Sequence, residues 1–445
     1  MKDYQRVADA VAAEIAAGRI GPGDRLPPQR EFARRHGIAS STATRVYGEL
    51  ARRGLTVGEV GRGTFVRAAP RPSAPALTEP TGNRVDLELN YPVAPEQAGL
   101  LAGGLGALLR PQALESAMRP AGADGTPAVR EAAADLLVRG GWRPDPSRVL
   151  FAGNGRQTIS AVISALVPPG GRLGAEELTY PVLKSIAARL GVTLVPLAMD
   201  SEGVVPEAVE EAHRDGPLHA VYVQPTLHNP LSITMTASRA GRLADVLDRS
   251  GIFAIEDTIW AFLRDDLPPL AALAPERTVL VDSLSKRVSP GLTLGFAVAP
   301  AAVLGSIAAA LRSGGLNPLR FALEAAARWQ TDGAVRTLVR AKQREAAVRQ
   351  DMVRRQLGDF AVRSGHRSYY CWWELPRPWR ADTFVAAAAR RGIGVTPAAA
   401  FAVGQGRAPN AVRVGLASPP AAVLSDALAT LAELARTAPD DLVID

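Results

Sequence analysis

The chain lacks the features that would place it outside the cell or in a membrane. Its single cysteine, Cys371, cannot form an intramolecular disulfide, which fits a reducing compartment. The N-terminal segment mixes acidic and basic residues and has no apolar stretch of the kind found in signal peptides. The longest apolar stretches, such as 301–311, fall far short of the roughly 20 residues that a membrane span needs. We therefore expect a cytoplasmic protein without a membrane partner.

Metal-ligand spacing is also missing. The five histidines and the one cysteine form no recognisable ligand pattern, so we expect no metal site. At 445 residues the chain is too long for one ordinary domain, and its 47% of apolar residues allow a large core. Two unequal domains are therefore expected.

The net charge of +7 is concentrated at one end of the chain. Residues 1–72 hold thirteen Lys and Arg against seven Asp and Glu, so this first sixth of the chain carries most of the excess. A compact basic unit on a nearly neutral body is typical of an attached nucleic-acid-binding module. An ordinary solvated basic surface would have the same composition, so charge alone leaves both readings open.

The first 68 residues predict three helices and a hairpin. Apolar residues at every fourth position predict a first helix over 7–15, followed by a glycine-rich turn. A second helix is expected over 27–36, and a third is capped by Ser40 or Ser41. Two short strands follow, joined by glycines that suit a tight turn. Helix, turn, helix and hairpin together predict a winged helix-turn-helix.

The run AAGRIGPGDRLPPQREFARRHGIASSTATRVYGELARRGLTVGEVGRGTFV resembles the DNA-binding domain of the GntR family over its whole length. The family implies that Arg30 binds a phosphate of double-stranded DNA. It also implies that the third helix enters the major groove through Ser40, Thr42 and Thr44, with Arg62 at the wing tip near the minor groove. Ser40 stands where the family commonly has an arginine, so the operator sequence cannot be deduced.

A linker and a much larger domain follow the basic unit. Residues 69–84 are rich in Pro, Ala, Ser and Thr without periodicity, which predicts a semi-extended linker between a domain at 1–68 and a second at 85–445. In the second domain, short β-type runs alternate with helical stretches. These runs are 149–151, 193–197, 220–223, 252–255 and 279–281. Strands separated by helices predict an α/β fold with a mostly parallel sheet, whose ligands gather at the carboxyl ends of the strands.

Four of these runs are followed by residues with useful chemistry. A glycine loop at 153–158 enters a helix and can hold a phosphate, QPTLHNP supplies an amide, Glu256-Asp257 supplies a carboxylate, and DSLSK supplies Lys286. Pyridoxal phosphate needs this set: a lysine for its aldehyde, a carboxylate for its ring nitrogen and an amide for its phenolic oxygen. Each residue alone has an ordinary structural explanation, but their joint occurrence in order favours a cofactor site.

These motifs resemble the fold-type I, pyridoxal-phosphate-dependent aminotransferases over nearly all of 85–445. The resemblance implies pyridoxal 5'-phosphate as cofactor and Lys286 as its Schiff-base lysine. The other residues that it assigns are Asp257 at the pyridine nitrogen, Asn229 at the phenolic oxygen, Tyr180 stacked on the ring, Ser283, Gly155, Arg156 and Gln157 at the phosphate, and Arg413 at the carboxylate of a ligand.

The sequence departs from this family at three positions near the cofactor. Thr293 stands where an arginine usually reaches the phosphate, Ile259 replaces a tyrosine at the phenolic oxygen, and Pro120 replaces another tyrosine. Arg156 or Arg287 would have to supply the missing guanidinium. Cofactor binding and, more so, efficient transamination are put in doubt by these changes.

A GntR-type domain joined to an aminotransferase-like domain is the arrangement of the MocR subfamily of regulators. The resemblance implies a homodimeric transcriptional regulator in which the large domain senses pyridoxal phosphate or an amino-acid-like or amine effector, with weak or no transaminase activity. One alternative is a catalytically active aminotransferase that carries a DNA-binding domain. Another is a DNA-binding protein whose large domain serves only for dimerisation. No catalytic residue is assigned on the first reading.

Overall fold

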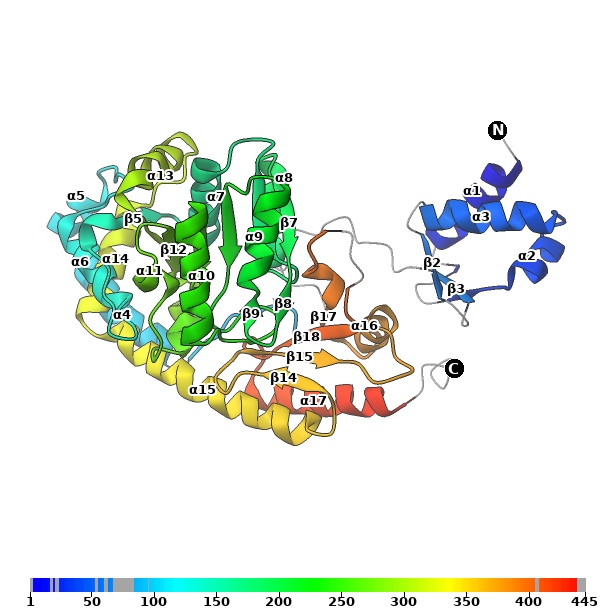
Figure 1. Ribbon diagram of the computed structural model, residues 1–445. Helices are drawn as coiled ribbons and strands as arrows, with labels where there is room; N and C mark the ends of the chain where they lie inside the picture. The colour runs from blue at the N-terminus through cyan, green and yellow to red at the C-terminus, as the bar shows by residue number, and fades with distance from the viewer. Residues whose placement is uncertain are drawn as a thin grey trace.

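The computed structural model describes residues 3–16, 19–20, 24–52, 55–59, 63–66, 84–94, 96–404 and 408–437. Arg62 and nearly all of the linker expected at 69–84 lie outside these residues. Figure 1 shows two units, a small helical one at the N-terminal end and a large α/β one that forms the rest of the molecule. Within the described residues, no helix is long and apolar enough to cross a membrane.

The small unit has the three helices and the two hairpin strands that the sequence predicts, and a short first strand that the sequence reading missed. They are α1 (Asp3–Ala16), β1 (Arg25–Leu26), α2 (Gln29–Arg35), α3 (Ser40–Arg52), β2 (Thr56–Glu59) and β3 (Gly63–Val66). The strands form an antiparallel sheet in the order β1-β3-β2. Phe32, Val46 and Leu50 are fully or almost fully buried between the helices, so the apolar faces read from the sequence form one core.

The large unit is built on a seven-stranded sheet. In spatial order its strands are β5 (Val149–Ala152), β13 (Gly295–Val298), β12 (Thr278–Ser283), β11 (Phe253–Asp257), β10 (Ala220–Val223), β6 (Arg172–Glu176) and β7 (Thr193–Leu197). The expected mostly parallel sheet is present, since β12, β11, β10, β6 and β7 run parallel. β13 is antiparallel to both of its neighbours. The sequence reading missed β6 and β13.

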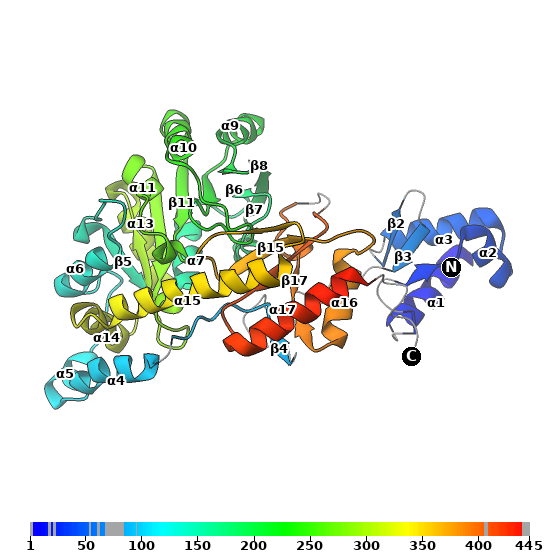
Figure 2. The same ribbon diagram turned by 90° about the horizontal axis from the view of Figure 1, so that it is seen from below.

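Helices cover both faces of this sheet, as Figures 1 and 2 show. One face packs against α7 (Gly155–Leu166), α8 (Pro181–Arg189) and α13 (Ala301–Ser313). The other packs against α6 (Pro127–Leu136), α9 (Pro206–Asp215), α10 (Ala237–Ser250), α11 (Leu270–Leu273) and α14 (Arg320–Thr331). Ala220 and Tyr222 of β10 point to the first core, whereas Val221 and Val223 point to the second, so this strand is apolar on both faces.

Shorter elements complete the large unit. They are α4 (Gln97–Leu108), α5 (Pro111–Ala117), β8 (Met199–Asp200), β9 (Gly203–Val204), α12 (Leu284–Arg287) and the 3-10 turns η1 (Pro146–Arg148) and η2 (Ala261–Leu263).

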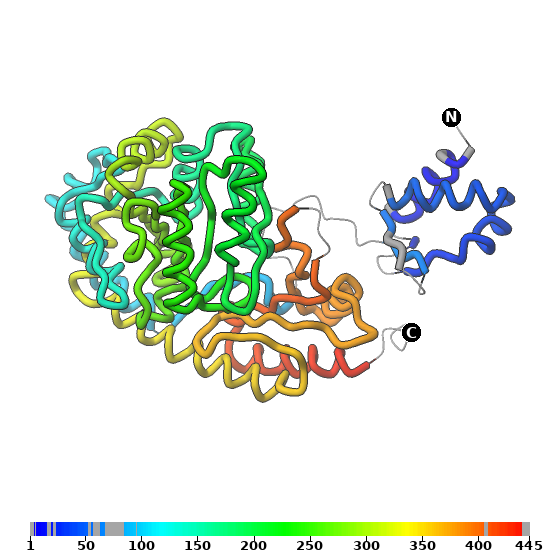
Figure 3. Tube along the Cα trace, in the orientation of Figure 1, coloured from blue at the N-terminus to red at the C-terminus, as the bar shows by residue number. Residues whose placement is uncertain are grey.

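A 24-residue helix, α15 (Ala334–Leu357), joins the large sheet to a smaller C-terminal layer. That layer contains β14 (Val362–Ser364), β15 (Tyr370–Glu374), α16 (Ala381–Arg390), β16 (Ile393–Gly394), β17 (Thr396–Pro397), η3 (Ala398–Ala400), β18 (Ala411–Gly415) and α17 (Ala421–Arg436). The chain enters the body through β4 (Val85–Asp86), which pairs with β16. Figure 3 accordingly shows the segment after the linker lying among the C-terminal segments.

Candidate functional site

Lys286 lies at the carboxyl edge of the large sheet, in the short helix α12 that follows β12. Its Nζ donates a hydrogen bond to the carbonyl oxygen of Asn90 at 2.6 Å and lies 4.5 Å from the centre of the Tyr91 ring. Burial, together with the charges of Arg413, Arg156 and Lys342, lowers the pKa of this amine to about 7. A lysine with this pKa is partly neutral at pH 7, as a nucleophilic amine must be.

Asp257 ends the neighbouring strand β11 and is 5% exposed. Its Oδ2 accepts hydrogen bonds from the hydroxyl of Tyr222 and from Nε2 of Gln224 at 3.2 Å, and its Oδ1 accepts the backbone N–H of Ile259 at 3.0 Å. Burial raises the pKa of Asp257 to about 6, while the donors oppose that rise. The carboxylate is therefore fixed in place and still mainly ionised at neutral pH.

Asn229, in the turn after β10, meets Arg413, which lies on β18 of the C-terminal layer. Nη1 of Arg413, on β18, donates to Oδ1 of Asn229 at 3.1 Å, and Nη2 donates to the carbonyl of Glu88 and to Oγ1 of Thr396 at 3.4 Å. The backbone N–H of Asn229 donates to Oε1 of Gln224 at 3.3 Å, which links this pair to Asp257. Nε of Arg413 is buried and has no partner among the described residues, so the guanidinium keeps one free donor.

The glycine loop and Ser283 form a compact cradle at the start of α7. Asn154 caps this helix by accepting the backbone N–H of Gln157 at 3.0 Å. A Cβ on Gly155 would lie 3.1 Å from Oγ of Ser283, so glycine lets the loop pack directly on the end of β12. A helix N-terminus beside a hydroxyl suits a phosphate group. Gly155, Gln157 and Ser283 are thus brought together as expected.

Tyr180 precedes α8 and is hydrogen-bonded by the exposed Arg156. Burial raises the pKa of Tyr180, and the charge of Arg156 opposes that rise.

The structure also distinguishes the two arginines that were candidates for the missing guanidinium. Arg287 is buried, pairs with Asp282 and lies against Phe262, whereas the charge of Arg156 acts on Lys286. Of the two candidates, Arg156 is therefore the one whose guanidinium is not held by a buried carboxylate.

The three unusual positions have different surroundings. The hydroxyl of Thr293 is buried and has no hydrogen-bond partner among the described residues. Ile259 packs against the aromatic cluster that contains Trp260 and Tyr370. Pro120 is exposed. None of these side chains carries the guanidinium or the phenol of the residue it replaces.

Several residues at the site were missed by sequence reasoning. Tyr222 and Gln224 donate hydrogen bonds to Asp257. The centre of the Trp260 ring lies 5.3 Å from Nζ of Lys286. Asn90 and Tyr91, which also contact this amine, come from the segment that enters the body. Tyr222 lies on β10 and Gln224 directly follows that strand, two positions later, so period-two alternation was an available signal. Asn90 and Tyr91 carried none, because they are nearly 200 residues from Lys286 in the chain.

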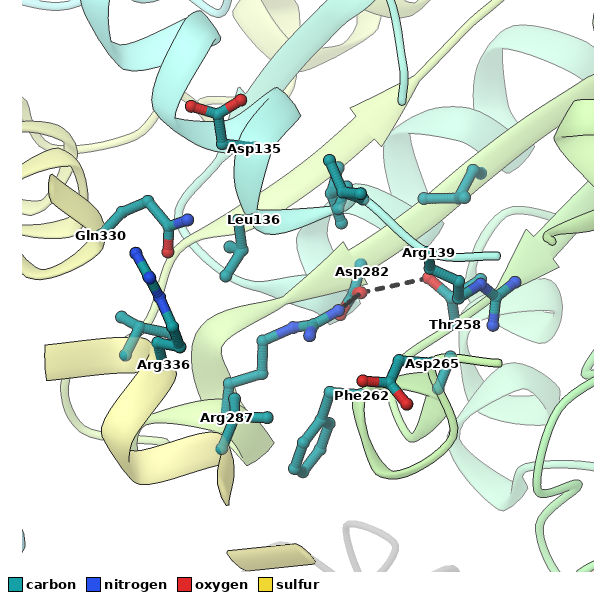
Figure 4. Close-up of a pocket in the computed structure, with 16 residues that line it drawn as sticks. Asp135, Leu136, Arg139, Thr258, Phe262, Asp265, Asp282, Arg287, Gln330 and Arg336 are labelled. Atoms are coloured by element: carbon teal, nitrogen blue, oxygen red, sulfur yellow. Dashed lines mark hydrogen bonds and ion pairs between the residues drawn. The ribbon is translucent and has the colours of Figure 1, made fainter. Parts of the chain in front are cut away.

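Figure 4 shows the residues that line a cavity of about 240 Å³ in the large unit. Thr258, Asp282 and Arg287 line it, each directly adjacent in the chain to a residue assigned to the cofactor. In Figure 4 the Arg287 side chain points to Asp282. The assigned cofactor residues themselves do not line this cavity.

The DNA-facing candidates lie on α2 and α3. Arg30, Ser40 and Thr44 are exposed, and Oγ1 of Thr44 donates to Oε1 of Gln29 at 2.8 Å. Thr42 is only partly exposed and lies away from the face that carries Ser40 and Thr44, because two residues rotate a helix by about 200°. Arg62 lies outside the described residues. Sequence reasoning left out Arg45, which is exposed on α3 one residue after Thr44.

Comparison with known families agrees with both parts of this architecture. The profile described as "Aminotransferase class I and II" matches residues 111–431, and the one described as "Bacterial regulatory proteins, gntR family" matches residues 3–66. The chain belongs to the class I and II aminotransferase family and, with its gntR domain, to the MocR subfamily of GntR-type regulators. The regulator therefore has a DNA-binding domain and an aminotransferase-like domain in one chain.

Relatives with the same arrangement cover almost the whole regulator. It is 29% identical to the uncharacterised HTH-type transcriptional regulator YdeF of Bacillus subtilis, over 94% of this chain and 90% of the relative. It is 27% identical to the HTH-type pyridoxine biosynthesis transcriptional regulator PdxR of Corynebacterium glutamicum, over 93% and 91% of the two chains. The crystal structure of LysN, the α-aminoadipate aminotransferase of Thermus thermophilus, matches 82% of this chain and 96% of its own with a TM-score of 0.71 at 20% identity. That likeness establishes a fold-type I aminotransferase fold.

Pyridoxal phosphate is the cofactor of this family, and the residues of the regulator fit it. A lysine amine of lowered pKa, a buried carboxylate and a helix N-terminus packed on Ser283 lie at one edge of the sheet. The free Nε of Arg413 and the charge of Arg156 make this edge suitable for anionic groups. The missing arginine at Thr293 does not remove the cradle.

Proposed function

We propose that the regulator is a cytoplasmic homodimer that binds double-stranded DNA through residues 1–68. Residues 69–84 serve as linker, and residues 85–445 hold pyridoxal phosphate as a Schiff base on Lys286. This body senses pyridoxal phosphate or an amino-acid-like effector. The observation that carries the proposal is the hydrogen-bonded series from Arg413 through Asn229 and Gln224 to Asp257, beside a lysine amine of lowered pKa.

Each assigned residue has one role in holding the cofactor. When bound, pyridoxal phosphate supplies an aldehyde and an electron-withdrawing ring. The carboxylate of Asp257 holds the proton on the pyridine nitrogen, and the amide of Asn229 donates to the phenolic oxygen. The remaining contacts come from the ring of Tyr180 on one face and from Ser283, Gly155, Arg156 and Gln157 at the phosphate.

Arg413 is proposed to bind the carboxylate of the effector. Its guanidinium is 4% exposed, and burial lowers its pKa only to about 10, so it remains charged at neutral pH. A planar guanidinium can bind a carboxylate with two parallel hydrogen bonds. The free Nε provides one of these donors, and Nη2 can provide the other by leaving the carbonyl of Glu88.

The proposed dimer is supported by an exposed apolar surface. Large apolar side chains remain exposed on and beside α4, α5 and the start of α14, which contact one another: Leu100, Leu109, Leu114, Met118 and Leu319. A second copy of the chain would remove this surface from water. Two DNA-binding domains would then face two half-sites. Light scattering should give twice the mass of the chain, and Met118→Glu with Leu319→Glu should lower it toward one chain.

The test of the cofactor proposal uses the whole chain. With pyridoxal phosphate, the parent protein should develop the long-wavelength absorbance band of a lysine-bound cofactor, and Lys286→Ala should lack it. Lys184→Ala is the matched control, because Lys184 is a partly buried lysine of the same unit whose Nζ donates to the carbonyl of Ala402 at 3.1 Å. A parent without the band would refute the cofactor role.

The same proteins separate a sensor from an enzyme. DNA ligands selected from a random library should bind the parent with an affinity that changes when an amino acid is added. Lys286→Ala should bind the same DNA without that change. Multiple turnovers between amino donors and keto acids would instead favour the active aminotransferase. Effector-independent DNA binding by the parent would contradict the sensor.

A further inference from the structure

Lysine is a rare residue in this chain. Only four of the 51 lysines and arginines are lysines: Lys2, Lys184, Lys286 and Lys342. Lys342 lies on α15 and is fully buried. A buried lysine differs from a buried arginine because it can lose its proton and still donate hydrogen bonds. It lies beside Lys286, the candidate cofactor lysine, whose carbonyl oxygen it contacts.

Lys342 holds the backbone at the cofactor lysine and just after it. Its Nζ donates to the carbonyl oxygen of Lys286 at 3.0 Å and to that of Val288 at 2.7 Å. α12 is only four residues long, so the carbonyls at its end have no helical partners and need outside donors. Gln97 adds a third donor, since its Nε2 donates to the carbonyl of Val288 at 3.1 Å.

The two hydrogen bonds do not depend on the charge of Lys342. Burial lowers the pKa of Lys342 to about 7, and the nearby Glu345 opposes this shift. A protonated amine has three N–H donors and a neutral one has two, so both forms can satisfy the two carbonyls. The contact therefore persists across neutral pH.

α15 links this contact to the part of the body that carries Arg413. The single O–H of Tyr369 is shared between two acceptors, the carbonyl of Lys342 at 2.9 Å and Oε2 of Glu345 at 2.8 Å. One turn further along, Arg349 donates to Glu345, to the carbonyl of Leu416 and, at 2.9 Å, to that of Pro419. Leu416 follows β18, the strand that bears Arg413. α15 thus contacts the backbone next to both assigned ligand-binding residues.

We propose that Lys342 is a positioning residue, which holds the Lys286 backbone against α15 so that the Lys286 amine meets the cofactor aldehyde in the correct place. This inference rests on the proposed Schiff base at Lys286. Because the hydrogen bonds of the Lys342 amine go to the backbone of Lys286 and Val288, its loss should affect the covalent link more than the phosphate cradle on α7. Removal of both hydrogen bonds leaves Lys286 with a freer backbone.

The experiment compares Lys342→Met, which keeps the length of the side chain but removes its donors, with the parent and Lys184→Met. In each protein the Lys286 amine adds to the aldehyde of pyridoxal phosphate with loss of water, and borohydride then reduces the C=N bond to a stable amine. Mass spectrometry counts cofactor bound covalently at Lys286, and quenching of protein fluorescence measures total bound cofactor. We expect the covalent fraction in Lys342→Met to fall about tenfold, with total binding within about twofold of the parent, since two hydrogen bonds of ordinary strength are lost. Lys184→Met should match the parent.

Each outcome has a defined meaning. Equal covalent fractions in Lys342→Met and the parent overturn the inference, as does a parallel loss of covalent and total binding, which would indicate general structural support. If Lys342→Met does not fold, the smaller Lys342→Leu replaces it, and failure of both to fold also counts against a positioning role. If the parent itself shows no covalent cofactor at Lys286, the proposed function fails and the inference fails with it, which is distinct from a loss confined to the Lys342 variants.

Discussion

The reactivity of Lys286 should follow a pKa near 7 instead of the ordinary lysine value of 10.5. Burial is the main cause of the lowered pKa, followed by the charges of Arg413, Arg156 and Lys342. With a pKa of about 7, about half of the Lys286 amines are neutral at pH 7, roughly a thousandfold more than at the ordinary value. Only the neutral amine has the lone pair that adds to an aldehyde.

The assay is a stopped-flow measurement of the rate at which cofactor-free protein binds pyridoxal phosphate covalently, made as a function of pH. The rate constant should fall about tenfold for each pH unit below 7 and level off above it. Dividing by the rate of a free lysine derivative corrects for titration of the cofactor itself. Arg413→Gln removes the most effective neighbouring charge and should move the midpoint of the profile to higher pH.

A profile that continues to rise toward pH 10.5 would refute this reasoning, because it would mean that Lys286 is solvated like a surface lysine. An unchanged midpoint in Arg413→Gln would refute the electrostatic part alone. Lys286→Ala should show no covalent phase and serves as the blank.

Three further predictions concern the DNA-binding domain and the stability of the body. Arg30→Ala should weaken binding to all DNA sequences alike and flatten the salt dependence of the binding constant, because a phosphate contact carries no sequence information. Titrations at several salt concentrations measure both effects. A changed sequence preference with an unchanged salt slope would contradict the phosphate role. Thr44→Ala should relax sequence discrimination in a random-library selection more than Thr42→Ala, because Thr44 lies on the exposed face of α3. Equal selectivity in both variants would argue against base contacts from that face. Arg139→Met should lower the free energy of unfolding by about 3 to 5 kcal/mol in urea titrations. The reason is that the fully buried Glu256 loses the ion pair that joins it to Arg139 at 3.2 Å. A loss below about 1 kcal/mol would show that the backbone N–H groups bonded to Glu256 are enough to stabilise its carboxylate.

The two-part architecture and the gathering of candidate cofactor residues at one edge of the sheet could be predicted from the sequence, because their signals are local. Amphipathic periodicity and glycine turns define α1, α2 and α3, and a strand followed at once by Asp257 or by the DSLSK run places chemistry at a strand end. Parallel strands share one carboxyl edge, so residues at their ends had to lie near one another. Arg413 was added to this set by the family resemblance alone, because no local sequence signal connected it to Asn229.

Local patterns failed where a neighbour far along the chain determines what a residue does. Thr42 has the right residue type for reading a base, but the packing of α3 on α1 and α2 turns it aside. Arg156 and Arg287 were equivalent in the sequence, and only the fold pairs Arg287 with Asp282 and leaves Arg156 near Lys286. A guanidinium reaches several ångströms from its backbone, so its partner depends on tertiary packing.

The sequence by itself determined which residues can react, and the tertiary structure decided their charge and position. A lysine after DSLS is a candidate nucleophile from its local motif alone, whereas its lowered pKa comes from burial and from cations on α7, α15 and β18. The contact of Lys342 with the Lys286 backbone spans 56 positions and has no counterpart in any periodic pattern. Short-range preferences act through the backbone and can be read along the chain, but desolvation and charge act through space, and that space exists only once the chain has folded.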